Sequence, residues 1–194
     1  MILLFLAWNV QPVHAQEWKF EKEKKGIKIF TREEPGKSKR SFKGEVYLHT
    51  TSVKIERLLS DTTNYSWWDE GIREVRMISC IKDKTFSYHM VYNVPWPFSD
   101  RDLYVRATIE KDTLHNRWTI VSRSIPNEFP EEKGLVRIND FWQIWTVEPV
   151  GQDSVHIILE GYADPSGNIP SWLYNMGTTD VPLNILENVK ARVE

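Results

Sequence analysis

Cysteine is almost absent from this chain of 194 residues, and the single one, Cys80, excludes two kinds of site. An internal disulfide needs a second cysteine, and a cysteine-based zinc cluster needs more than one thiolate. Cys80 follows Met77 and Ile78 in an apolar stretch, so we expect a small buried side chain rather than a reactive thiol. The fold must therefore be held by its core, and the chain is long enough to form one.

An excess of charge of either sign is also missing. The chain has 25 Lys and Arg residues against 27 Asp and Glu residues, a formal net charge of −2. General nucleic-acid-binding domains present a strongly basic face, so we expect no nucleic-acid partner. Basic residues do gather within residues 19–43, but glutamates are interleaved with them, which favours a solvated face over a membrane-attracting patch.

The motifs of the common enzyme classes are lacking as well. The five histidines are scattered without the spacing of a zinc protease. There is no Gly-x-Ser-x-Gly nucleophile elbow and no phosphate-binding glycine loop. Paired carboxylates occur at Asp100 and Asp102, but a structural role at the junction of a loop with a strand, described below, accounts better for Asp102. We therefore predict no catalytic residues, no metal ligands and no cofactor.

Long hydrophobic runs are missing too. Residues 1–8 read MILLFLAW, which is too short to cross a bilayer because a spanning helix takes about 20 residues. Val13-His14-Ala15 then offers the small or branched residues that signal peptidase accepts. We interpret residues 1–15 as a signal peptide of an exported protein, although no basic residue precedes the run. A buried N-terminal helix in a cytoplasmic protein is the alternative, and residues 17–194 form one domain in either case.

Tryptophan, by contrast, is abundant, with nine residues. So many large amphipathic rings suit a core that lines a cavity, or a surface that meets an apolar partner.

Apolar periodicity predicts strands first and one long helix last. Residues 18–30 and 42–48 have strand spacing, and Thr51-Ser52 is an expected helix N-cap. Further strands are predicted near residues 75–79, 85–93, 103–109, 118–122, 141–147 and 155–159. From residue 169 the period becomes helical, and Pro182 should kink or restart that helix. This order predicts an α+β fold, a curved antiparallel sheet wrapped around a C-terminal helix.

The stretch at residues 93–102, NVPWPFSDRD, is the most distinctive part of the sequence. Two prolines around Trp96 make a stiff loop, and Arg101 and Asp102 at its junction with a strand are typical of structural hydrogen bonds. Together with other pieces in the same order, this stretch resembles the START family of StAR-related lipid-transfer domains. The other pieces are Gly26-Ile27-Lys28-Ile29-Phe30, Trp68-Asp69, Val105-Arg106, Gly134-Leu135-Val136-Arg137 and residues 164–173.

This resemblance covers roughly residues 17–194 and implies a helix-grip fold with a tunnel for one hydrophobic ligand, such as a sterol or a phospholipid. It implies that the loop at 93–100 and the C-terminal helix flank the tunnel mouth. Arg106 matches a position whose arginine can face the cavity beside an acidic partner, but His89 or Tyr88 stands at the partner position here. Structural partners and a ligand headgroup remain equal alternatives for Arg106.

We therefore expect a monomer that binds a lipid-class ligand for transport or presentation, with transient membrane contact. Polar ligand contacts are expected from Arg106, His89 and Tyr88. Apolar contacts are expected from Trp67, Trp68, Trp96, Trp145, Tyr162, Trp172, Met176 and Leu183. Ordinary packing is the alternative for each, and for Trp96 we favour a loop anchor over membrane insertion. An enzyme of the polyketide cyclase or aromatase type, and a lipid sensor that does not transport, remain open.

Overall fold

The computed structural model of the chain describes residues 17–61, 65, 67–82 and 84–194, without the side chains of residues 171–173, 175 and 176. The predicted signal peptide at 1–15 lies outside the described residues, as do the side chains of Trp172 and Met176. No helix in the described part of the chain has the length and apolar character needed to cross a membrane.

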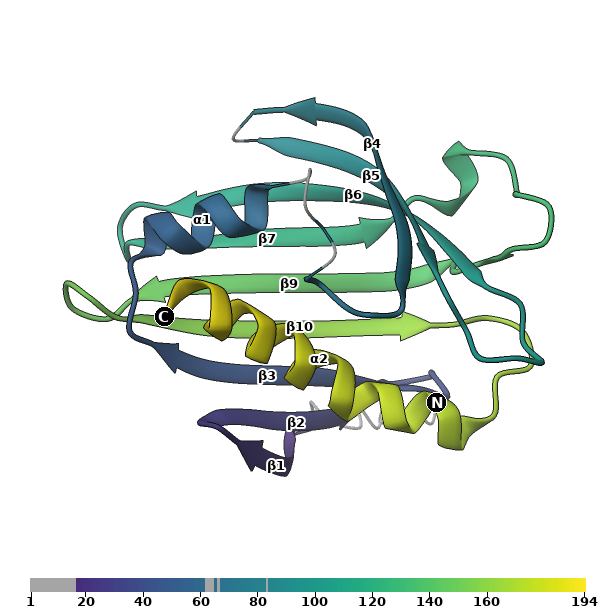
Figure 1. The fold of residues 1–194 in the computed structure, drawn as a ribbon, viewed down its shortest axis with the longest axis horizontal. Coiled ribbons are helices and arrows are strands. Elements are labelled where there is room, and N and C mark those ends of the chain that lie inside the picture. Colours follow the sequence, from purple (N-terminus) through teal and green to yellow (C-terminus); the bar gives the residue numbers. More distant parts are fainter. Residues whose placement is uncertain (1–16, 62–64, 66, 83) are drawn as a thin grey trace, which may run out of the picture.

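A ten-stranded, mainly antiparallel sheet forms most of the molecule (Figure 1). Its strands are β1 (Lys19–Lys24), β2 (Ile27–Glu33), β3 (Arg40–Leu48), β4 (Ile72–Ile81), β5 (Thr85–Tyr92), β6 (Arg101–Asp112), β7 (Arg117–Ser124), β8 (Val136–Arg137), β9 (Asp140–Pro149) and β10 (Val155–Asp164). Their order is β1-β2-β3-β10-β9-β7-β6-β5-β4, and β8 lies parallel to the start of β6. The first three strands therefore join the sheet beside the last one.

The helices are α1 (Ser52–Ser60), the short 3-10 helix η1 (Pro126–Glu128) and α2 (Ser171–Val193). The sheet curves around α2, and α1 lies on the same face (Figure 1). The predicted α+β arrangement of a curved antiparallel sheet around a long C-terminal helix is confirmed. The helix continues through Pro182 as one element rather than restarting there. Residues 67 and 68 form a turn between α1 and β4.

The C-terminal half of α2 packs closely on the first strands. Leu186 and Val189 are fully buried. A Cβ atom on Gly44 would lie 2.6 Å from Leu186 Cδ1 and 3.4 Å from Ile29 Cδ1. Because glycine has no side chain, β3 lets the helix approach the sheet at this point. The N-terminal half of α2 is fixed separately, since the Tyr174 hydroxyl donates to the backbone oxygen of Arg40 at 2.7 Å.

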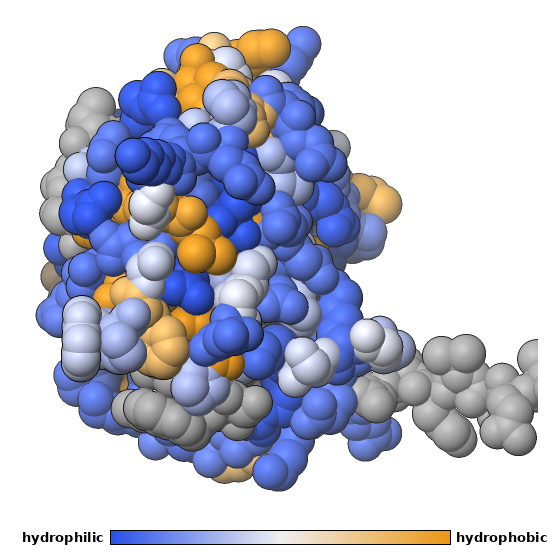
Figure 2. Space-filling view, turned by 90° about the vertical axis from the view of Figure 1, so that its right-hand side faces the viewer, coloured by the Kyte–Doolittle hydropathy of each residue, from blue (hydrophilic) through white to orange (hydrophobic). Residues whose placement is uncertain are grey.

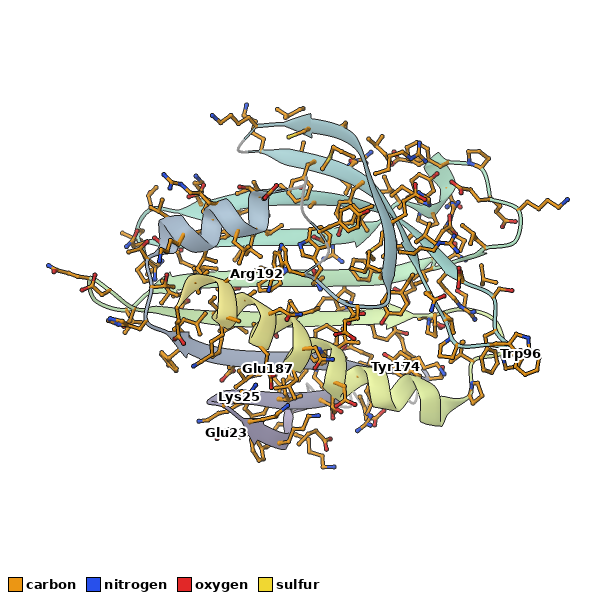
Figure 3. The ribbon with its side chains drawn as sticks, in the orientation of Figure 1. Glu23, Lys25, Trp96, Tyr174, Glu187 and Arg192 are labelled. Atoms are coloured by element: carbon orange, nitrogen blue, oxygen red, sulfur yellow. The ribbon has the colours of Figure 1, made fainter. Side chains whose placement is uncertain are left out.

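Ion pairs join the β1–β2 hairpin to α2. Lys24 Nζ and Lys25 Nζ lie 2.9 and 3.0 Å from the two carboxylate oxygens of Glu187, and Lys22 pairs with Asp180. Figure 3 shows Lys25 of the hairpin beside Glu187 of the helix. The basic N-terminal segment therefore meets acidic residues of the helix as well as solvent.

Cys80 is exposed, so the prediction that it is buried is wrong. It lies near the end of β4, an edge strand whose residues are all exposed or half-buried. The apolar neighbours of Cys80 in the sequence misled the prediction, because a strand at the edge of a sheet is only partly covered.

Candidate functional site

A pocket of about 660 Å³ lies between the inner face of the sheet and α2. Most of its walls are apolar and aromatic side chains, contributed by the turn before β4, by β5, β6, β7, β9 and β10, and by α2. The view onto the end of the molecule that carries the 93–100 loop shows hydrophobic surface gathered in patches among hydrophilic residues (Figure 2).

Aromatic rings in contact with one another form one wall of this pocket. The ring centroids of Trp67 and Trp68 are 6.2 Å apart, those of Trp68 and Tyr88 are 5.7 Å apart, and those of Tyr88 and Phe86 are 6.1 Å apart. All four residues line the pocket. The structure thus brings together Trp67, Trp68 and Tyr88, three of the predicted site residues, and adds Phe86. Phe86 lies two positions before Tyr88 on the same strand, and side chains two positions apart point to the same face. The sequence could therefore have placed Phe86 beside Tyr88.

Tyr88 is the predicted polar residue that does line the pocket. It is 5% exposed, and burial raises the pKa of its phenol. A phenol is uncharged at neutral pH even at its ordinary pKa, and burial disfavours the phenolate further. Among the described residues the hydroxyl has no hydrogen-bond partner, and it remains able to donate and accept.

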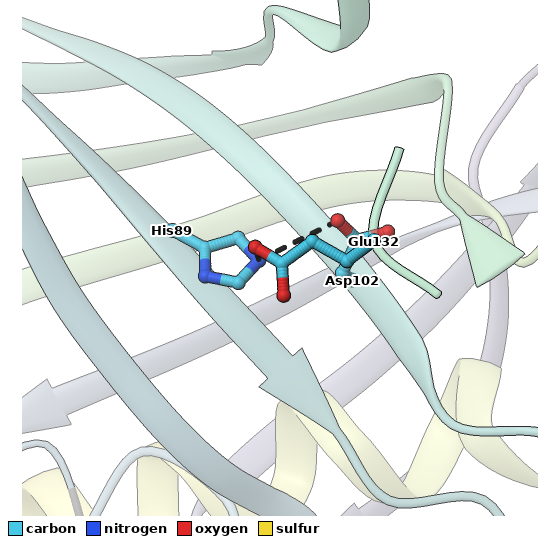
Figure 4. A group of neighbouring side chains, drawn as sticks. All are labelled: His89, Asp102 and Glu132. Carbon is cyan, nitrogen blue, oxygen red and sulfur yellow. Dashed lines mark ion pairs between the residues drawn. The ribbon is translucent and has the colours of Figure 1, made fainter. Parts of the chain in front are cut away.

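His89 faces the opposite side of β5, because side chains alternate along a strand. It is 1% exposed, and its ring lies 4.3 Å from that of Tyr104. Its Nε2 atom is 3.4 Å from Asp102 Oδ2 and 3.7 Å from Glu132 Oε1 (Figure 4). The expectation that His89 contacts a ligand inside the cavity is therefore wrong, because the side chain lies on the outer face of the sheet.

The donor atoms of His89, Asp102 and Glu132 lie within 4.8 Å of one another, a spacing that a metal ion would accept. Arg137 already occupies this group, since its Nη2 is 2.7 Å and its Nε 2.8 Å from Asp102 Oδ2. A buried guanidinium opposes a second cation at the same oxygen. Arg137 also donates to the backbone oxygens of Pro126 and Pro130, and the Tyr104 hydroxyl donates to Glu132 Oε1 at 3.1 Å. The arrangement therefore holds the segment containing Glu132 against the outer face of the sheet.

Arg106 also lies outside the pocket, which corrects the expectation that it faces the cavity. Its Nη1 and Nη2 atoms donate to the two carboxylate oxygens of Glu128 at 2.9 and 2.6 Å, with nearly half of its side chain exposed. Along β6, Leu103, Val105 and Ala107 are buried. Arg106 alternates with them and therefore points to the outer face of the sheet. Of the alternatives left open by the sequence, the structural carboxylate partner is the one observed.

Arg101 is the buried arginine of the site. It is 3% exposed and lines the pocket. Its guanidinium donates to the backbone oxygens of Pro165 at 3.0 Å and Ser166 at 3.1 Å, and also to that of Ser99. It thus joins the 93–100 loop to the segment that leads into α2. The predicted structural roles of Arg101 and Asp102 are confirmed.

Two neutral polar side chains, Ser122 and Gln143, lie opposite each other on β7 and β9 and line the pocket. Gln143 Oε1 accepts a hydrogen bond from Trp145 Nε1 at 3.2 Å. Trp145 lines the pocket and is 7% exposed, and the ligand contact expected of it stays a prediction. Sequence reasoning missed Ser122 and Gln143, although they share the parity of Ile120 and Trp145 on their strands.

The remaining predicted site residues have different positions relative to the pocket. Tyr162 contributes to the pocket lining, with Lys37 Nζ 4.1 Å from its ring centroid. Leu183 is buried in the main core but is not part of the pocket lining. Trp96 is 92% exposed and projects at the tip of its loop (Figure 3), so the preference for a packed loop anchor is wrong. The contacts predicted for Trp172 and Met176 fall on side chains outside the described residues.

The curved sheet, the C-terminal helix that it grips and the pocket between them define a helix-grip protein. A profile of the START domain family matches residues 12–193. The chain therefore belongs to the START domain family.

Individual relatives have the same fold or a similar sequence. The crystal structure of a STAR-related lipid transfer protein from Xanthomonas axonopodis has a TM-score of 0.81 and 29% identity, covering 90% of this chain and 97% of that one. An uncharacterized protein of Pseudomonas aeruginosa is 27% identical over 93% of this chain and 88% of its own length. Phosphatidylcholine transfer protein of Rattus norvegicus is 29% identical over 64% of this chain, and the match spans 59% of that protein.

Proposed function

We propose that the chain binds one lipid-class molecule in the large pocket and carries or presents it. The observation that carries this proposal is the pocket of about 660 Å³ with mainly apolar and aromatic walls. This volume lies within the range of about 300–1,000 Å³ that is usual for small-molecule sites. Burial of an apolar ligand against such walls is favourable by about 25 cal/mol for each Å² removed from water.

The relatives support the same class of ligand. The protein from Xanthomonas axonopodis and that from Rattus norvegicus are both named for lipid transfer. The chain spans about three fifths of the second protein, so its particular ligand is not carried over.

Exchange of the ligand with a membrane is the second part of the proposal. Trp96 is 92% exposed on a loop that Arg101 ties to the segment before α2. An exposed tryptophan partitions favourably into the interfacial region of a bilayer. Contact of this loop with a membrane would place the start of α2, which lines the pocket, near the lipid surface.

Native mass spectrometry of protein purified gently from its own host, followed by organic extraction, tests the binding proposal. We expect a stoichiometric lipid that co-purifies with the chain. Protein of bare mass that also takes up no sterol, phospholipid, fatty acid or isoprenoid alcohol would contradict it.

A second measurement separates transport from sensing. Transfer of a bound lipid from donor to acceptor vesicles is expected to accelerate when the protein is added in catalytic amounts. Tight binding without acceleration would favour a sensor that presents the ligand without moving it.

A further inference from the structure

We infer that the ligand is an uncharged amphiphile, such as an isoprenoid or sterol alcohol, and that Ser122 and Gln143 bind its hydroxyl or carbonyl group. This inference rests on the proposed function, since it assigns the chemical class of ligand to the same pocket. It is drawn from the charges, the free hydrogen-bonding groups and the volume of that pocket.

The described lining offers an anionic headgroup one cation, and that cation already donates to three backbone oxygens. Arg101 is the one basic residue in the described lining, and its guanidinium is engaged by three backbone oxygens. The positions outside the described residues contain no lysine or arginine. Transfer of a carboxylate or phosphate into apolar surroundings without a cationic partner costs several kcal/mol in real proteins.

The acidic residues of the lining oppose an anion further. Asp69 Oδ1 accepts hydrogen bonds from the Tyr92 hydroxyl at 2.8 Å and from the backbone nitrogen of Gly71 at 2.7 Å. Glu70 and Asp180 also contribute to the lining. The lining thus has three carboxylates, of which Asp180 is paired with Lys22, against the one guanidinium of Arg101. This gives no excess of positive charge that would favour a fatty-acid or phosphate headgroup.

Neutral hydrogen-bonding groups, in contrast, remain available. Ser122 is 3% exposed, and its hydroxyl makes no hydrogen bond with the part of the chain that the structure describes. The amide nitrogen of Gln143 is equally without a partner there, while its oxygen is engaged by Trp145. Together they present a donor–acceptor hydroxyl beside an amide donor on adjacent strands. A ligand hydroxyl or carbonyl satisfies both groups, and buried polar groups normally have such a partner.

The volume limits the size of this ligand. A pocket of about 660 Å³ corresponds to about 22 water-sized groups, because a water molecule occupies about 30 Å³ in the liquid. An isoprenoid alcohol or a sterol is close to this size. A phospholipid with two long acyl chains is considerably larger and also carries a phosphate.

A matched pair of ligands tests the charge of the headgroup. Geranylgeraniol and geranylgeranoic acid share one skeleton and differ in an uncharged alcohol against a carboxylate that is ionised at neutral pH. We expect the protein to bind the alcohol at least tenfold more tightly, measured by native mass spectrometry or quenching of the pocket tryptophans. Equal or tighter binding of the acid, or of phosphatidylcholine from vesicles, would overturn the inference while leaving lipid binding intact. Failure to bind any of the three, or any sterol, would overturn both.

Two variants test the residues. Ser122→Ala and Gln143→Leu are each expected to weaken binding of geranylgeraniol about fivefold, since each removes one hydrogen bond. Binding of the hydrocarbon with the same skeleton should not change. Ser87→Ala is the matched control, because Ser87 is also buried but is paired with Arg106 on the outer parity of the sheet. Gln143→Met keeps the test available if Gln143→Leu folds poorly. Unchanged affinity for the alcohol in both pocket variants would contradict the assignment.

Discussion

Arg101 and Arg106 belong to the same strand, and the direction of each side chain decides its role. Arg101 points inward, is 3% exposed and donates to three backbone oxygens of two loops. Arg106 points outward and pairs with Glu128 at the surface. Removal of the first leaves buried acceptors unpaired, whereas removal of the second returns a carboxylate to water.

Replacement of Arg101 by lysine should therefore lower the free energy of unfolding by about 2–4 kcal/mol, because a single ammonium cannot reach all three carbonyl oxygens. Urea unfolding at neutral pH measures this loss. Arg106→Lys is the control and should cost less than about 1 kcal/mol. Equal effects of the two substitutions would show that the buried hydrogen bonds do not stabilise the loop junction.

The limit of sequence-based prediction is clearest at Tyr88 and His89. Either residue could stand at the expected headgroup position, and only the pairing of β5 with its neighbours shows that Tyr88 faces the pocket. For Arg106 the alternation with Leu103 and Val105 was visible in the sequence and indicated the outward face. The family resemblance left a structural partner and a ligand headgroup as equal alternatives, and the structure shows the structural partner, Glu128.

At the scale of elements, the strands and the C-terminal helix were predictable from periodicity because each has a long, regular apolar pattern. The order of the strands was not, since the pairing of β3 with β10 joins segments far apart in the chain. The free polar pair on β7 and β9 was missed for the same reason. Ser122 and Gln143 become neighbours only through the register of those strands.

The link between the β1–β2 hairpin and α2 should depend on pH. Ion pairs with Lys24 and Lys25 hold the pKa of Glu187 below its ordinary value of 4.5. A lowered folded-state pKa stabilises the fold above that ordinary value, and the contribution is lost as the pH falls through the folded-state pKa. Glu187→Gln should thus cost up to about 1 kcal/mol at pH 7. Thermal unfolding at pH 7 and near pH 3 should show the difference from the parent protein shrinking in acid; a constant difference would contradict this role.

The close approach of α2 to β3 predicts opposite effects for two glycines. Gly44→Ala should lower the free energy of unfolding by about 1–3 kcal/mol, because the new Cβ would lie 2.6 Å from the buried Leu186 Cδ1. Gly177 lies within α2, and its new Cβ would find Val181 Cγ2 at an ordinary 3.9 Å. Gly177→Ala should therefore raise stability by about 0.5–1 kcal/mol. Denaturant unfolding of both variants checks the signs, and destabilisation by both would contradict the argument.

On the scale of the whole molecule, the two most exposed large apolar side chains among the described residues lie at opposite ends. Trp96 is 92% exposed on the loop before β6, and Leu114 is 85% exposed in the turn between β6 and β7. The two ends of β6 lie on opposite sides of the molecule (Figure 1). The end with Trp96 also holds the segment that leads into α2, so the proposed membrane contact belongs there.

Trp96→Ser should slow lipid transfer between vesicles several-fold without changing the affinity of the pocket in solution, because the tryptophan does not line it. Leu114→Ser is the control and should leave the transfer rate unchanged. Both substitutions should alter thermal stability little, as expected for exposed positions. Equal rates for the parent and the Trp96 variant would place the membrane contact elsewhere.

The pairing of β3 with β10 also has a consequence during protein synthesis. Phe42, in the pocket wall, is paired with Gly161, so the ribosome makes β4 to β9 before β3 gains its second neighbour. At about 5–20 residues per second this takes several seconds, during which the inner face of β3 has no sheet to close against. A nascent chain thus cannot enclose a ligand, and loading must follow the release or near-completion of the polypeptide.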